Sequence, residues 1–219
     1  MKLEKMDEFF DSRLSIYEEH QLHVIHSANL FYPFTASQLP TAAGCHILDL
    51  GCGTGLELDA YFKINPFAAV TGIDLAEGML KTLQAKFPNK ELTLIHGSYF
   101  DVPLGENRFD AAVSVESLHH FTQEQKISLY HRLHKSLKDG GYFILTDYLA
   151  ETEEEEKENF RQFLQLKKEW DVNDNDFYHF DTPLTREHET EALLSGGFSK
   201  VELLNSWRQT YTLKAYKEI

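Results

Sequence analysis

The amino-acid sequence predicts an α/β fold with a mostly parallel seven-stranded sheet, helices on both faces, a terminal antiparallel hairpin and a helical cover at the N-terminus. Over residues 44–148, short apolar runs rich in β-branched residues alternate with helix-length segments. This alternation is typical of parallel strands joined by right-handed crossovers. Two further apolar runs, 200–205 and 209–216, are separated only by residues 206–208 and predict the hairpin.

The alternating region contains the predicted parallel strands and the helices that connect them. Each strand run is bounded by Gly, Pro, Asp or Asn, and each helical segment places apolar side chains three or four positions apart. The predicted strands cover residues 45–50, 69–74, 92–97, 109–115 and 142–148. The predicted helices cover residues 55–64, 76–87 and 123–138.

The regions on either side are predicted to complete a single domain. Residues 1–43 have a mostly helical pattern and are expected to cover the sheet. Residues 149–184 carry a helical insertion and a proline-containing turn. Residues 185–219 carry a helix that ends at two glycines, followed by the hairpin. The core of the domain is therefore expected at residues 44–148.

Composition and charge exclude several classes of protein. Hydrophobic residues make up 42% and charged residues 26% of the 219 positions, as in ordinary globular proteins. The 21 Lys and Arg against 35 Asp and Glu give a net charge of −14, which repels phosphate backbones and disfavours nucleic acid as a partner. No run approaches the roughly 18 apolar residues of a membrane helix. The charged start MKLEKMDEFFDSR is unlike a signal peptide, so we expect a cytoplasmic protein without membrane contact.

The segment HILDLGCGTG, residues 46–55, joins a predicted buried strand directly to a predicted helix. Gly51 permits a tight turn, Gly53 lets the backbone approach a ligand, and Gly55 lets the helix pack closely on the strand. Asp74 ends the next strand about twenty residues later, where a carboxylate can accept hydrogen bonds from both hydroxyls of a ribose. The two features predict a nucleotide-like ligand at the carboxyl edge of the sheet.

The identity of that ligand depends on the spacing and charge of the loop. NAD-binding loops have the spacing G-x-G-x-x-G, whereas this loop has G-x-G-x-G. Asp49 lies two residues before the first glycine, which is unfavourable beside a pyrophosphate but suits a cationic ligand. S-adenosylmethionine carries a sulfonium and an ammonium group. The charge of the loop therefore favours S-adenosylmethionine, with an NAD-dependent oxidoreductase as the alternative.

Four segments in order, LDLGCGTG, GIDLAEGML, IHGSYFDVPL and FDAAVSVESLHHF, resemble the class I S-adenosylmethionine-dependent methyltransferases, which have a Rossmann-like fold. The similarity is greatest to a small-molecule group that includes the quinone-biosynthesis C-methyltransferases. It implies an enzyme that transfers a methyl group in line to a small-molecule acceptor and releases S-adenosylhomocysteine, with residues 149–184 over the active site. The alternative is a non-catalytic subunit that binds S-adenosylmethionine. The sequence does not determine the acceptor or the choice between monomer and homodimer.

The resemblance also implies roles for individual residues. The loop would hold the methionine part and Asp74 the ribose. The family often has Gly-Asp after the third strand; Gly97 and Ser98 stand here, which leaves the adenine contact to Ser98, Tyr99 or the backbone, with Asp101 a weaker candidate. The residues implied for the cofactor are Arg13, Tyr17, Asp49, Gly51, Cys52, Gly53, Asp74, Leu75, Met79, Ser98, Tyr99, Val115 and Glu116. The alternative for Arg13, Tyr17, Leu75 and Met79 is an ordinary packing or surface role.

Methyl transfer requires alignment of acceptor, methyl and sulfur and exclusion of water, and a general base is optional. His120 is the first candidate for acceptor contact or base and His119 the second, because both follow the fourth predicted strand. The alternative is that they are buried and hydrogen-bonded at a helix entry. Tyr148, Tyr178 and His179 are expected to line the acceptor pocket.

The sequence predicts no metal site. His20, His23 and His26 share one face of a predicted helix, but no acidic or sulfur ligand nearby completes a coordination set. The two cysteines, Cys45 and Cys52, belong to no CxxC pair, so neither a disulfide nor a zinc centre is expected.

Overall fold

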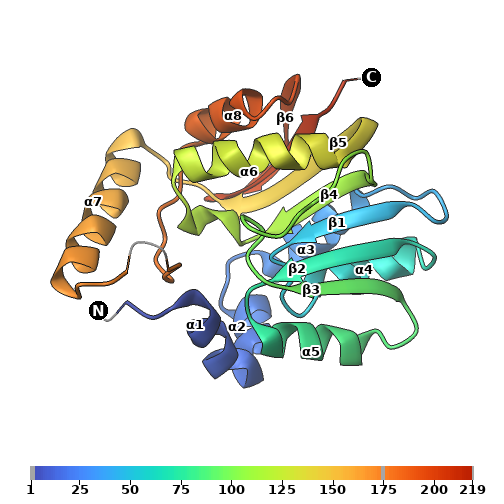
Figure 1. Cartoon of the computed structure of the whole chain (residues 1–219), viewed down its shortest axis with the longest axis horizontal. Helices are drawn as coiled ribbons and strands as arrows, with labels where there is room; N and C mark the ends of the chain where they lie inside the picture. Colours follow the sequence, from blue (N-terminus) through green and yellow to red (C-terminus); the bar gives the residue numbers. More distant parts are fainter. Residues whose placement is uncertain (1–2, 174–175, 219) are drawn as a thin grey trace.

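The computed structural model, which describes residues 3–173 and 176–218, contains one seven-stranded sheet with the order β3-β2-β1-β4-β5-β7-β6 (Figure 1). The pairs from β3 to β5 are parallel, and β7 pairs antiparallel with both β5 and β6. The predicted fold class is confirmed. The strands are β1 (His46–Leu50), β2 (Ala69–Asp74), β3 (Glu91–His96), β4 (Phe109–Val115), β5 (Leu137–Tyr148), β6 (Lys200–Trp207) and β7 (Thr210–Tyr216).

Helices cover both faces of the sheet, because each face is apolar. One hydrophobic cluster joins the sheet to α3 (Ala28–Ser37), α4 (Leu56–Ile64) and α5 (Glu77–Lys86). A second cluster joins it to α6 (Gln123–Ser136) and α8 (Arg186–Ser195). Figure 1 shows α6 in front of the sheet and α3 and α4 behind it. No helix in the described ranges is both long and apolar enough to cross a membrane.

The remaining helices lie near the ends of the parallel strands. α1 (Met6–Arg13), the 3₁₀ turn η1 (Leu14–Ile16) and α2 (Tyr17–His23) precede α3, so the predicted N-terminal helical region is interrupted rather than continuous. α7 (Glu153–Glu169) buries none of its residues and projects from the body of the molecule (Figure 1). A second 3₁₀ turn, η2 (Leu118–His120), follows β4.

The chain after α7 returns to α1 and is tied to it by backbone contacts. Met6 N–H donates to the carbonyl of Phe177 at 3.0 Å, and His179 N–H donates to the carbonyl of Glu4 at 3.0 Å. This contact places two segments that are far apart in sequence over the same edge of the sheet. That edge is the one where β1, β2 and β4 end.

The boundaries of two predicted elements were wrong. The helix after β4 ends at Ser136 and β5 begins at Leu137, not at residue 142. The register explains the difference: Leu137 pairs with Phe109, and the ladder then shifts before Tyr142 pairs with Ala111. The hairpin turn also lies later than expected, at residues 208–209 rather than 206–208, because β6 continues to Trp207.

The glycines near β1 provide a test of what the loop requires of its backbone. Gly55 has φ +73°, and a Cβ there would lie 2.9 Å from Leu83 Cδ1, whose side chain is fully buried. Gly44 has nearly the same φ, +72°, but a Cβ there would meet nothing within 4 Å. Substitution of Gly44 would therefore cause backbone strain alone, whereas substitution of Gly55 would cause backbone strain and a steric clash.

We expect Gly44→Ala to lower the free energy of unfolding by about 1 kcal/mol, which is the cost of a left-handed conformation alone. Gly55→Ala should lower it by at least about 1 kcal/mol more, because α4 must also move away from α5. Urea denaturation of both variants measures the difference. Equal losses would show that close packing of α4 does not depend on Gly55.

Candidate functional site

The loop after β1 bends sharply because its glycines have left-handed backbone conformations. Gly51 has φ +73° and Gly53 has φ +48°. A Cβ at Gly51 would lie 2.1 Å from Ser117 Oγ, and one at Gly53 would lie 3.5 Å from Tyr17 Oη. The loop is therefore closely flanked by the segment after β4 on one side and by α2 on the other, and side chains at these glycines would close the space between them.

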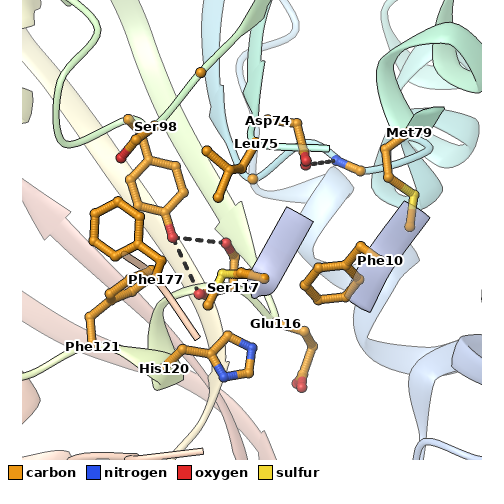
Figure 2. Close-up of a pocket in the computed structure, with 15 residues that line it drawn as sticks. Phe10, Asp74, Leu75, Met79, Ser98, Glu116, Ser117, His120, Phe121 and Phe177 are labelled. Atoms are coloured by element: carbon orange, nitrogen blue, oxygen red, sulfur yellow. Dashed lines mark hydrogen bonds between the residues drawn. The ribbon is translucent and has the colours of Figure 1, made fainter. Parts of the chain in front are cut away.

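Asp74 lies at the carboxyl end of β2 and connects this strand to the loop. Its Oδ2 accepts a hydrogen bond from Gly53 N–H at 2.8 Å (Figure 2), and its Oδ1 accepts one from Ala76 N–H at 2.8 Å. Burial raises the pKa of this carboxyl group, whereas the two backbone N–H groups oppose the shift. Each oxygen keeps a further lone pair for a ligand hydroxyl.

Two buried carboxyl groups lie beneath the loop. Asp49, in β1, is 1% exposed, and Glu57, in the first turn of α4, is 5% exposed. The two carboxyl groups interact with each other, and within the described residues Asp49 Oδ2 and Glu57 Oε1 have no hydrogen-bond partner. Burial raises the pKa of both carboxyl groups, and the neighbouring Glu57 raises that of Asp49 further. Unpaired buried acceptors of this kind fit a cationic, hydrogen-bond-donating ligand.

A narrow cavity of about 50 Å³, which we call the cleft, runs from the loop across the ends of β2 and β3. Figure 2 shows Leu75 and Met79 on one side of it and Ser98, Phe121 and Phe177 on another. The lining residues are Met6, Phe10, Gly51, Gly53, Asp74, Leu75, Met79, Gly97, Ser98, Tyr99, Glu116, Ser117, His120, Phe121 and Phe177. The lining of the cleft combines apolar side chains with the carboxylate of Asp74, which are the groups that contact a base and a ribose.

A larger cavity of about 580 Å³, which we call the outer cavity, adjoins the cleft. Phe10, Glu116 and His120 line both cavities, so the two spaces meet at the end of β4. Aromatic side chains from α1, α2 and β6 contribute much of the outer wall. Its size allows a ligand in the cleft to meet a second molecule at the junction.

Four ionisable groups gather where the two cavities meet. His119 Nδ1 lies 2.6 Å from Asp147 Oδ1, and Asp147 Oδ2 accepts a hydrogen bond from Leu118 N–H at 2.9 Å. Asp181 Oδ1 lies 3.6 Å from His119 Nε2 and 3.2 Å from His120 Nδ1. Asp147 is 0% exposed, so this carboxylate fixes η2 from within the protein.

The surroundings separate the pKa values of the two histidines. Burial alone would lower the pKa of His119, but Asp147 and Asp181 raise it to about 9. Burial and the adjacent His119 lower the pKa of His120. Burial also raises the pKa of Glu116 to about 7, although His119 acts in the opposite direction. Glu116 has φ +49°, an uncommon conformation for a side-chain-bearing residue that directs the chain out of β4.

The structure brings most of the sequence-predicted residues to one edge, but not all side chains reach the cavities. The side chain of Cys52 packs against Gly72 in the core, and Val115 is buried beneath the site. Arg13 lines the outer cavity, where its guanidinium pairs with Glu4 at 3.1 Å. Tyr17 lines the outer cavity as well, as do Tyr148 and His179. Tyr178 is buried and lines neither cavity.

Sequence reasoning missed several residues of this site, among them Glu57, Asp147, Asp181 and Phe10. Glu57 was detectable as an acid in the first turn after the glycine loop, and Asp147 as an acid at the end of a buried strand. Asp181 and Phe10 carry no such local signal. They join the site only through the contact between α1 and the chain after α7.

Comparison with known proteins is consistent with this geometry. Residues 48–145 match a family described as a methyltransferase domain. The demethylmenaquinone methyltransferase of Symbiobacterium thermophilum is 35% identical over 106 residues, which are 46% of this chain and 41% of that protein. The chain spans 27%, 53% and 55% of the length of three other curated relatives that it matches.

Solved structures share the fold over most of the chain. A protein of Nostoc punctiforme assigned as an O-methyltransferase superposes with a TM-score of 0.72 and 19% identity, covering 99% of this chain and 63% of that one. Human N-acetylserotonin methyltransferase, solved with S-adenosylmethionine, superposes with a TM-score of 0.63 and 18% identity, covering 88% and 53%. At this level of identity the likeness establishes the fold alone.

The buried carboxyl groups lead to a prediction for the ligand-free protein. A raised folded-state pKa means that the stability contributed by Asp49 is fully present below its unfolded-state pKa and is lost as the pH rises through the folded-state value. We expect Asp49→Asn to raise the free energy of unfolding at neutral pH by about 1 kcal/mol or more. The difference from the parent protein should vanish as the pH falls toward about 4. Urea denaturation over a pH series measures it.

Asp110→Asn is the matched control, because its carboxylate is stabilised rather than unpaired. Burial is opposed there by His46 N–H at 2.8 Å and Lys138 Nζ at 2.7 Å, which lower the pKa of Asp110. This variant should lose stability at neutral pH. A loss of stability in Asp49→Asn as well would contradict a ligand-directed role for the buried pair.

Proposed function

We propose that this chain, whose residues 48–145 match a methyltransferase-domain family, binds S-adenosylmethionine and transfers its methyl group to a small-molecule acceptor. The observation that carries the proposal is the pair of buried carboxyl groups, Asp49 and Glu57, beside a glycine loop whose Gly53 N–H donates to Asp74. One oxygen of each group has no hydrogen-bond partner among the residues that the structure describes. These acidic groups would repel the negatively charged pyrophosphate of a dinucleotide. S-adenosylmethionine brings an ammonium and a sulfonium instead.

The residues present fit the parts of S-adenosylmethionine. Asp74 would hold the ribose hydroxyls at the end of β2. Leu75, Met79, Ser98 and Tyr99 surround the part of the cleft that would take the adenine. The methionine end would lie over Gly51 and Gly53, with its ammonium directed toward Asp49 and Glu57. Tyr17 would cover it from α2, since the Tyr17 hydroxyl lies beside Gly53.

The acceptor would enter the outer cavity and approach the methyl group at the junction. When bound, S-adenosylmethionine supplies an electrophilic methyl carbon, which bonds to the acceptor atom as the carbon–sulfur bond breaks to give S-adenosylhomocysteine. An acceptor that carries a proton loses it to a neighbouring group or to water. Glu116 and His120 are placed to contact the acceptor, because both line the cleft and the outer cavity.

The covering segments support transfer by excluding water from the junction. α1 contributes Phe10, and the chain after α7 contributes Phe177, to the walls of the cleft. Enclosure of this kind favours methyl transfer over reaction with solvent and holds the reactants in line, which is the main contribution that the protein has to make. A monomer provides all of the residues named here.

The proposal is tested by calorimetric titration of the full chain with S-adenosylmethionine, S-adenosylhomocysteine and NAD. We expect saturable binding of the first two and none of NAD. Asp74→Ala should weaken binding by about 10- to 100-fold, since two hydrogen bonds to ribose hydroxyls are lost. Asp139→Ala, an exposed change at the opposite edge of the sheet, is the matched control and should leave affinity unchanged.

Two results would contradict the proposal. Binding of NAD without S-adenosylmethionine would assign the cleft to an oxidoreductase. Equal affinity in Asp74→Ala and the parent protein, with thermal melting showing that both are folded, would remove the assigned ribose site. Binding of S-adenosylmethionine without methyl transfer to any member of a panel of hydroxyl, amine and acidic-carbon acceptors would instead indicate a non-catalytic binding subunit.

A further inference from the structure

Three potential metal ligands from two distant segments meet at the junction of the cavities. His119 and His120 lie in η2, and Asp181 lies 60 or more residues later, in the chain that returns from α7. One ligand atom from each lies within 4.8 Å of the others. Asp181 is half-exposed on the side of the outer cavity, which all three residues line.

Two of the three separations between the ligand atoms fit the geometry of a tetrahedral site. Zinc binds imidazole nitrogen and carboxylate oxygen at about 2.0 to 2.2 Å. Neighbouring ligand atoms on a tetrahedron of that size are roughly 3.3 to 3.5 Å apart. Asp181 Oδ1 lies 3.2 Å from His120 Nδ1 and 3.6 Å from His119 Nε2, so these pairs need to move by only a few tenths of an ångström to share a cation.

His119 is also oriented by a buried carboxylate, as metal-binding histidines commonly are. Asp147 engages His119 Nδ1 at 2.6 Å, which leaves Nε2 directed toward Asp181 and the cavity. Metal-binding histidines are commonly oriented in this way by a buried carboxylate. His120 Nδ1 also lies 3.2 Å from the carbonyl oxygen of Phe180, a contact that must yield when a cation binds. The carbonyl oxygen is itself close enough to become an additional ligand.

We propose that His119, His120 and Asp181 form a binding site for Zn²⁺ or a chemically similar divalent cation at the mouth of the acceptor cavity. Two imidazole nitrogens with one carboxylate favour such cations over Mg²⁺ or Ca²⁺, which prefer oxygen ligands. Because all three residues line the outer cavity, a position not taken by protein ligands would be open to a molecule in that cavity. This is the arrangement of sites in which a metal binds substrate rather than only stabilising the fold.

The role of the cation, unlike its binding, rests on the proposed methyl transfer. It would bind an acceptor hydroxyl oxygen and lower the free energy of its deprotonation. That oxygen would then form the bond to the methyl carbon as the carbon–sulfur bond breaks, with the proton released to solvent. The inference therefore indicates an acceptor with a hydroxyl or enol oxygen.

The proposed site departs from the sequence-based expectation of no metal. That expectation considered His20, His23 and His26, which are exposed in the structure. Local spacing on one helix directed attention to those three residues. The present set was not detectable by spacing, because Asp181 reaches η2 only through the return of the chain after α7.

The test is calorimetric titration of the full chain, stripped with a chelator, with Zn²⁺, together with the visible absorption of a Co²⁺-loaded sample. We expect one equivalent of Zn²⁺ and the intense visible bands of four-coordinate Co²⁺. Asp181→Ala and His120→Ala should each weaken Zn²⁺ binding by at least about 10-fold. His23→Ala removes an exposed histidine outside both cavities and should change nothing.

Thermal melting keeps the test decisive if a variant is poorly folded. Zn²⁺ should raise the melting temperature of the parent protein and of His23→Ala, but not that of Asp181→Ala, whose substituted side chain is half-exposed. The inference would be overturned if the parent protein did not bind Zn²⁺, or if Asp181→Ala and His120→Ala both bound Zn²⁺ as tightly as the parent protein. S-adenosylhomocysteine binding, titrated on the same samples without metal, reports separately on the proposed function.

Discussion

The position of β1 between β2 and β4 is the constraint on which the rest of the structure depends. From β1 the chain continues toward β2 and β3 on one side, whereas from β4 it continues toward β5 on the other side. The loops after β1 and β4 therefore diverge and leave a crevice at the carboxyl edge of the sheet. The glycine loop and Glu116 reach that crevice because they follow strands of the parallel set, and Asp74 reaches it because it is the last residue of β2. Ser117 then lies so close to Gly51 that no larger residue fits there.

A site prepared for a cationic ligand is costly for the free protein. Asp49 and Glu57 are buried without full hydrogen bonding, which disfavours their ionised forms until a positive group arrives. The fully paired carboxylate of Asp147, in contrast, holds η2 by two strong contacts and is satisfied without a ligand. The same kind of side chain thus stabilises the fold at the end of β5 and opposes it beneath the loop.

Closure of the site depends on two segments that lie outside the parallel core. α1 and the chain after α7 join through backbone hydrogen bonds and cover the carboxyl edge together. Their contact supplies Phe10 and Phe177 to the cleft and brings Asp181 over the histidines of η2. The nucleoside end of the site is therefore built by the core, whereas the junction where an acceptor would react is built by the cover.

The sequence by itself determined the alternating core, the glycine loop and Asp74, because strand periodicity and the short strand-to-helix turn are local properties. It did not determine where β5 begins, since that boundary follows from pairing with Phe109 in another strand. Only the tertiary structure decided the grouping of His119, Asp147 and Asp181, which are separated by 28 or more residues along the chain. Loop closure over such lengths is set by packing of the whole domain, and no local pattern records it.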